Sequence, residues 1–185
     1  MKNAKIKQMV GISIMAAIVV VLQLLGSFIH FGPVSVSLVL IPIVVGAAVY
    51  GPSAGAILGV VFSAVVLMQP DTSFFYGISV FGTVATVLVK GTLAGLLAGY
   101  TYRVLAKVNR TLAVFISAVV CPVVNTGIFF LGCRLFFWEA LAEVGGGDAF
   151  MYVITVMIGF NFLAELATNM VCSPVIHRIL RIVKI

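Results

Sequence analysis

The sequence predicts an all-α integral membrane protein with six transmembrane helices and both termini in the cytoplasm. Three observations predict this fold class: an apolar composition, six separate apolar segments, and basic residues on alternate connections. Of the 185 residues, 63% are hydrophobic and 9% are charged, whereas soluble domains are about half apolar and about a quarter charged. So few polar residues cannot cover a water-exposed surface. We therefore expect a single transmembrane domain over residues 1–185.

Each apolar segment approaches the roughly 20 residues that an α-helix needs to cross about 30 Å of hydrocarbon. The second segment is short and contains Pro42, and the turn Tyr50-Gly51-Pro52 joins it tightly to the third. The expected helices cover residues 10–29, 36–50, 53–69, 78–102, 112–136 and 151–176.

The charges indicate how the helices are oriented. With six crossings, nine basic residues fall on one side of the membrane: Lys2, Lys5, Lys7, Arg103, Lys107, Arg110, Arg178, Arg181 and Lys184. The other side carries Asp71, Glu139, Glu143 and Asp148, with Arg134 at its margin. Because excess Lys and Arg mark the cytoplasmic face, both termini are expected inside the cell. Topology thus explains the net charge of +6 better than a nucleic-acid partner does.

Polar residues inside the expected spans carry most of the functional information. A charge near the bilayer centre costs at least about 2.5–3.5 kcal/mol, so Lys90 and Glu165 should face a partner or a cavity. At 1.5 Å per residue they lie about 18 Å and about 21 Å from the outer surface, which lets them meet. Either they form a structural ion pair, or they form the polar floor of an outward-facing pocket. The candidate substrate-binding residues are Gln23, His30, Thr83, Thr86, Lys90, Asn125, Asn161 and Glu165.

Small residues at a spacing of four mark faces where helices approach closely in lipid. Gly55 and Gly59 form one such pair, Gly91, Gly95 and Gly99 form a longer stripe, and Ser13 and Ala17 form a third set. Each face serves either to pack helices within the chain or to dock a membrane partner. The candidate docking residues are Ser13, Ala17, Gly55 and Gly59.

The motifs of most enzyme classes are missing from the sequence. It contains no phosphate-binding loop ending in Lys-Ser or Lys-Thr, and no nucleophile with a neighbouring base. The three cysteines are isolated within apolar segments, so core packing is expected for them rather than a metal cluster or a disulfide framework. We therefore expect neither catalysis nor a cofactor.

Length, topology and three sequence stretches together resemble the substrate-specific (S) components of energy-coupling-factor (ECF) transporters. The first stretch, residues 50–59, looks like the family's Gly-Pro-x-x-Gly-x-x-x-Gly pattern. Residues 88–99, with Lys90-Gly91-Thr92, and residues 161–169, from Asn161 to Asn169, are similar to members of the group. The resemblance extends over nearly the whole chain.

The resemblance implies a mechanism for nutrient uptake in a prokaryotic cell membrane. Such a subunit binds a vitamin-like nutrient near the outer face, and the connection at residues 28–37, with His30, is expected to cover the pocket. It docks on a transmembrane coupling protein that two cytoplasmic ATPases drive. The family's first helix often carries an Ala-x-x-x-Ala docking motif. Here Val21 follows Ala17 at the fourth position, so Ser13 and Ala17 would replace the motif.

The sequence is compatible with more than one kind of substrate and with more than one class of function. Lys90 and Arg134 suit a carboxylate or a phosphate, whereas Glu165 suits a cationic ring or amine. We favour a small anionic or zwitterionic nutrient. A stand-alone secondary transporter or channel would need a continuous polar path, and an intramembrane enzyme would need a catalytic set.

Overall fold

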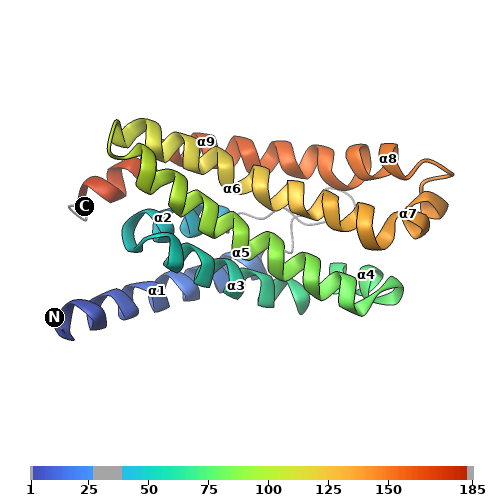
Figure 1. Ribbon diagram of the computed structural model, residues 1–185, viewed down its shortest axis with the longest axis horizontal. Helices are drawn as coiled ribbons and strands as arrows, with labels where there is room; N and C mark the ends of the chain where they lie inside the picture. Colours follow the sequence, from blue (N-terminus) through green and yellow to red (C-terminus); the bar gives the residue numbers. More distant parts are fainter. Residues whose placement is uncertain (1, 27–38, 183–185) are drawn as a thin grey trace.

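The computed structural model describes residues 2–26 and 39–182, and these are helical apart from short turns (Figure 1). The expected all-α class is therefore confirmed for the described chain. Its elements are α1 Lys2–Gly26, α2 Leu40–Tyr50, α3 Pro52–Leu67, η1 Pro70–Thr72, α4 Ser73–Ile78, α5 Val80–Leu105, α6 Arg110–Gly132, η2 Cys133–Phe137, α7 Trp138–Val144, α8 Ala149–Tyr152, η3 Val153–Gly159 and α9 Phe160–Ile182.

Four helices of the described chain are long and apolar enough to cross a membrane. They are α1, α5, the continuous helix Arg110–Val144 and the continuous helix Ala149–Leu180. A fifth span results if α3 and the η1–α4 segment count as one, bent by 77°. With 11 residues, α2 extends only about 16 Å. The residues before it lie outside the described chain, so six crossings remain a prediction.

Several helix boundaries differ from the expected ones. The segment expected to connect the third and fourth helices is itself helical, as η1 and α4. Its side chains explain why: Thr72 Oγ1 donates to the Val66 carbonyl over 2.6 Å, and Tyr76 Oη donates to the Leu67 carbonyl over 3.1 Å. The Tyr76 bond satisfies the Leu67 carbonyl in the last turn of α3, where carbonyls lack a helical partner, and the Val66 carbonyl also accepts from the Gln69 amide. The fifth expected helix, residues 112–136, likewise extends further: α6 continues through the π-helical segment η2 into α7.

Helices α3 and α5 pack through glycine against glycine. A Cβ on Gly55 would collide with the Gly95 carbonyl, and a Cβ on Gly59 would collide with the Gly91 carbonyl. Ser63 Oγ adds a buried hydrogen bond of 2.7 Å to the Val87 carbonyl. Both Gly55 and Gly59 are thus buried inside the chain, and packing accounts for them. As partner-docking residues they would need α3 and α5 to separate.

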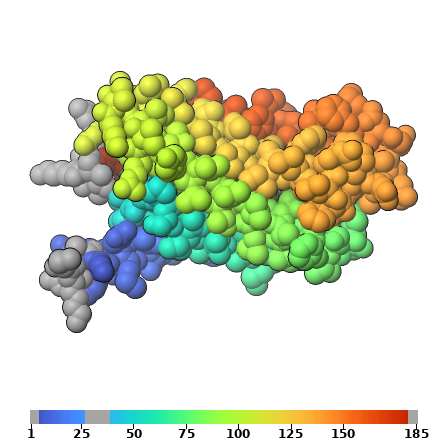
Figure 2. All heavy atoms as spheres, viewed as in Figure 1, coloured from blue at the N-terminus to red at the C-terminus, as the bar shows by residue number. Residues whose placement is uncertain are grey.

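The ends of the molecule separate charges of opposite sign. Helix α1 begins and α9 ends at one end, where the α5–α6 junction also lies (Figure 1). That junction carries Lys107 and Arg110. The opposite end holds α4 and the α7–α8 turn, with Asp71 and Glu143. This arrangement supports an even number of crossings, whereas the sidedness stays a prediction. Figure 2 shows the first part of α1, in blue, at the lower left corner of the molecule.

Candidate functional site

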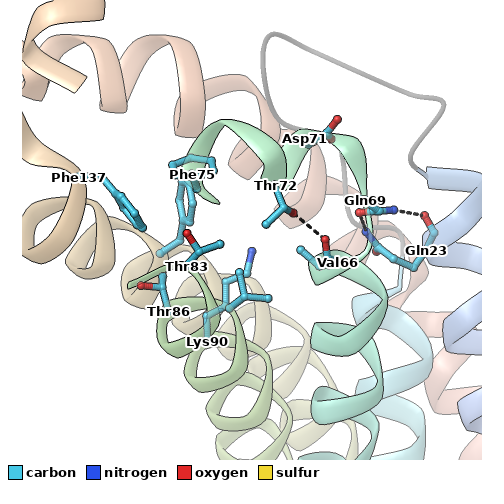
Figure 3. Close-up of a pocket in the computed structure, with 12 residues that line it drawn as sticks. Gln23, Val66, Gln69, Asp71, Thr72, Phe75, Thr83, Thr86, Lys90 and Phe137 are labelled. Carbon is cyan, nitrogen blue, oxygen red and sulfur yellow. Dashed lines mark hydrogen bonds between the residues drawn. The ribbon is translucent and has the colours of Figure 1, made fainter. Parts of the chain in front are cut away.

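A cavity lies beside the upper part of α5, between the α3–η1–α4 bend and α6 (Figure 3). Its polar lining consists of Gln23, Gln69, Asp71, Thr72, Thr83, Thr86 and Lys90. Its apolar lining consists of Val66, Phe75, Val87, Phe129 and Phe137. Four of the eight residues expected from sequence to bind substrate therefore meet here: Gln23, Thr83, Thr86 and Lys90.

Helix α5 supplies the polar wall because its spacing keeps Thr83, Thr86 and Lys90 on one face. Ser79 caps this helix, since its Oγ accepts from the Gly82 amide at 3.1 Å. Thr83 Oγ1 donates to the Ser79 carbonyl over 2.7 Å. The buried Thr86 Oγ1 has no hydrogen-bond partner within the described chain. This hydroxyl points away from Lys90 (Figure 3) and lies beside Gly132 of α6.

Lys90 lies deepest on this wall. Its side chain is 8% exposed, and its nitrogen points into the space between Thr83 and Val66 (Figure 3). The ammonium sits 5.2 Å from the centroid of the Phe129 ring and 5.8 Å from that of Phe62. Such cation–π contacts contribute about 0.5–2 kcal/mol each. The charge of Glu165 also acts on Lys90.

A pair of amides joins α1 to the end of α3 at the cavity wall. Gln23 Nε2 donates to Gln69 Oε1 over 3.0 Å, and Gln69 Nε2 donates to the Gln23 backbone carbonyl over 3.2 Å. Both side chains are buried. Gln69 could not be selected from the sequence, because it stood at the expected helix end, where an amide is usually solvated.

Aromatic rings form the other wall. Phe75 packs edge-to-face on Phe129 and on Phe137, with ring centroids 5.7 Å and 5.1 Å apart. These residues could not be selected from the sequence, since apolar side chains in apolar helices carry no distinguishing signal. Phe75 was also expected in the connection between two helices, whereas the structure places it in α4, where it lines the cavity.

Three further candidates are buried between α6 and α9 and do not line the cavity: Asn125, Asn161 and Glu165. Asn161 Nδ2 donates to the Met157 carbonyl over 3.1 Å, and Glu165 lies within electrostatic range of Cys121 on α6. The remaining candidate, His30, and the connection expected to cover the pocket lie outside the described residues.

The size of the cavity limits what fits in this conformation. Its volume is about 50 Å³, whereas pockets for drug-sized ligands typically measure about 300–1,000 Å³. A volume of this order accommodates a few water-sized groups. Any larger ligand therefore requires the walls to move apart.

Comparison with known proteins decides the family. The sequence pattern of the family described as ECF transporter, substrate-specific component, matches residues 7–177. The chain belongs to this family. No curated protein and no solved structure matches it. The resemblance inferred from its motifs is thereby confirmed, and with it the membrane location of the chain.

Family membership gives the cavity its context. An S component is a transporter subunit that associates with an ECF module and a small-molecule substrate. In this S component the cavity lies at the end of the molecule away from the α5–α6 junction (Figures 1 and 3). Ser13 and Ala17 are exposed on α1, and large apolar side chains surround them, including Met9, Ile14 and Val21. The exposed face of α1 is thus available to lipid or to a membrane partner.

Proposed function

We propose that this S component captures a small vitamin-like nutrient from outside a prokaryotic cell and delivers it through an ATP-driven ECF module. One observation carries the proposal: in a chain of this family, four polar residues chosen from the sequence surround one cavity, at the end opposite the basic loops. In this proposal the chain crosses the plasma membrane six times, with both termini in the cytoplasm.

Gln23, Thr83, Thr86 and Lys90 contact the nutrient directly in this proposal. Asn125, Asn161 and Glu165 form a polar layer beside it, and His30 belongs to the cover. Entry requires the cavity to widen, and the widening needs segments that can move as units.

Docking on the coupling protein uses the exposed face of α1. Ser13 and Ala17 are the small residues on that face, and small residues allow membrane helices to approach closely. Gly55 and Gly59 pack against the backbone of α5, so α1 offers the more accessible surface for docking. The coupling protein in turn recruits two cytoplasmic ATPases.

Native mass spectrometry of the protein purified from its host membrane tests this proposal. We expect a complex with a coupling protein and two ATPase chains, and a small molecule bound to the S component. Transport by the purified chain alone in liposomes would contradict the proposal and would favour a stand-alone transporter. Turnover of a lipid by the purified chain would instead favour an enzyme.

A further inference from the structure

We propose that the cavity takes a small organic monoanion in one orientation, with its carboxylate on Lys90 and a hydrogen-bond donor of the ligand on Gln23. This proposal rests on the proposed function, because it assigns a chemical class to the substrate of the same cavity. It is argued from three parts of the wall, which are the ammonium, the unpaired amide oxygen and the phenylalanines.

The Lys90 ammonium has unused hydrogen-bonding capacity. It carries three N–H donors, yet within the described chain it makes no hydrogen bond or ion pair, and its close contacts are the Phe62 and Phe129 rings. Ring faces compensate only part of the cost of removing an ammonium from water. The charge of Glu165 acts on it from a distance and supplies no oxygen to these donors. A ligand oxyanion that enters the cavity would accept hydrogen bonds from this ammonium.

Gln23 needs a hydrogen-bond donor, whereas Lys90 needs an acceptor. Its side chain is 1% exposed, and its Nε2 is already bonded to Gln69. Its Oε1 is buried and has no hydrogen-bond partner within the described chain. An amide oxygen only accepts hydrogen bonds, and leaving a buried acceptor unpaired is costly. A hydroxyl or amide N–H of the ligand would satisfy it.

The remaining walls restrict the charge and shape of the ligand. Val66 lies between Lys90 and Gln23, and Phe75 and Phe137 offer carbon surface on the other side of Lys90 (Figure 3). Lys90 is the cation among the described lining residues, so the lining balances one negative charge rather than two. A phosphate monoester carries a charge of about −1.5 to −2 at neutral pH. A monocarboxylate therefore suits these walls better.

Arg134, the other cation considered for an anion, lies elsewhere. It is exposed on η2, and its guanidinium stacks 4.6 Å from the centroid of the Trp138 ring. It lines a separate surface hollow together with Glu139 and Glu143, whose negative charges oppose an anion. The structure thus assigns the carboxylate to Lys90 and not to Arg134.

The test measures the thermal stability of the full-length purified protein with a yeast nutrient extract in two forms. One form is untreated, and in the other the carboxylic acids have been converted to methyl esters. We expect the untreated extract to raise the unfolding temperature and the esterified extract to lose that effect. Equal stabilisation by both forms would overturn the carboxylate assignment while leaving the proposed function intact. No stabilisation by the untreated extract at any dose would contradict the proposed function itself.

Variants then locate the two ends of the ligand. Lys90→Met should abolish the stabilisation by untreated extract, and Lys90→Arg should retain part of it. Gln23→Leu should raise the extract dose needed for half of the effect by about tenfold, as loss of one buried hydrogen bond predicts. Gln8→Leu removes an exposed glutamine from the same helix and should leave the dose unchanged. An unchanged dose for Gln23→Leu would overturn the orientation.

Discussion

At the scale of single residues, the unusual feature is a lysine ammonium held between two phenylalanine rings inside an apolar bundle. Within the described chain two neighbouring side chains carry oxygens without a hydrogen-bond partner, which are Thr86 Oγ1 and Gln23 Oε1. Each of these groups would be better satisfied in water, so their presence together costs folding free energy. Such a cost is expected at a site where binding a ligand compensates for it.

The interaction between Lys90 and Glu165 gives the first prediction. Lys90→Met removes the positive charge near Glu165, and Glu165→Gln removes the negative charge near Lys90. Each change should destabilise the protein, by up to about 3–5 kcal/mol for a fully buried pair. The double variant should regain much of that loss, which thermal unfolding of all four proteins in detergent would measure. Losses that simply add would show that the two charges do not interact.

At the scale of elements, the α3–α5 contact rests on glycine because two backbones touch. Gly95→Ala places a methyl group against the Gly55 carbonyl, and backbone atoms cannot move aside cheaply. We predict a loss of about 1–3 kcal/mol in the free energy of unfolding, as for other overpacked cores.

Gly127→Ala is the matched control for this change. Gly127 also lies in a helix, α6, but a Cβ there meets nothing within 4 Å. Alanine should then be neutral or should stabilise the protein by up to about 1 kcal/mol, because it is the better helix former. Equal losses at both positions, measured as thermal midpoints, would mean that the α3–α5 contact is not tight.

Helix α1 gives the second prediction at this scale. Ala17→Trp adds a large ring to the exposed face and should block co-purification with the coupling protein, with stabilisation by the untreated extract intact. Val123→Trp is the control, because Val123 is exposed on another helix, α6, and this change should leave co-purification intact. If the complex survives Ala17→Trp, docking uses another surface.

The long helices and part of the cavity lining could be predicted from the sequence. Long apolar segments predicted α1, α5, α6 and α9, because spans of lipid require apolar length. Their polar interruptions identified Lys90, Thr83, Thr86 and Gln23, since a polar group in lipid must face inward. Gln69 and Phe75 could not be chosen in this way. Their role depends on the bend after α3, where Thr72 and Tyr76 donate side-chain hydrogen bonds back to carbonyls six and nine residues earlier, and no apolar pattern in the sequence indicates such a bend.

At the scale of the whole molecule, sidedness is the property that the fold alone leaves to experiment. The α5–α6 loop and the α7–α8 turn lie at opposite ends (Figure 1). We predict that Val108→Cys, in a variant without the native cysteines, reacts with an impermeant maleimide only after the cells are opened. Glu143→Cys should react in intact cells. The reverse pattern would place the cavity on the cytoplasmic side.

The most direct test of the central claim is uptake by liposomes that contain this S component together with its co-purified ECF module. The vesicles would be given a defined mixture of vitamins outside and ATP on the side of the ATPases, and mass spectrometry would identify what accumulates. The account predicts accumulation of one carboxylate-bearing component that requires ATP and fails with Lys90→Met. Accumulation without ATP, or unchanged accumulation with Lys90→Met, would contradict it.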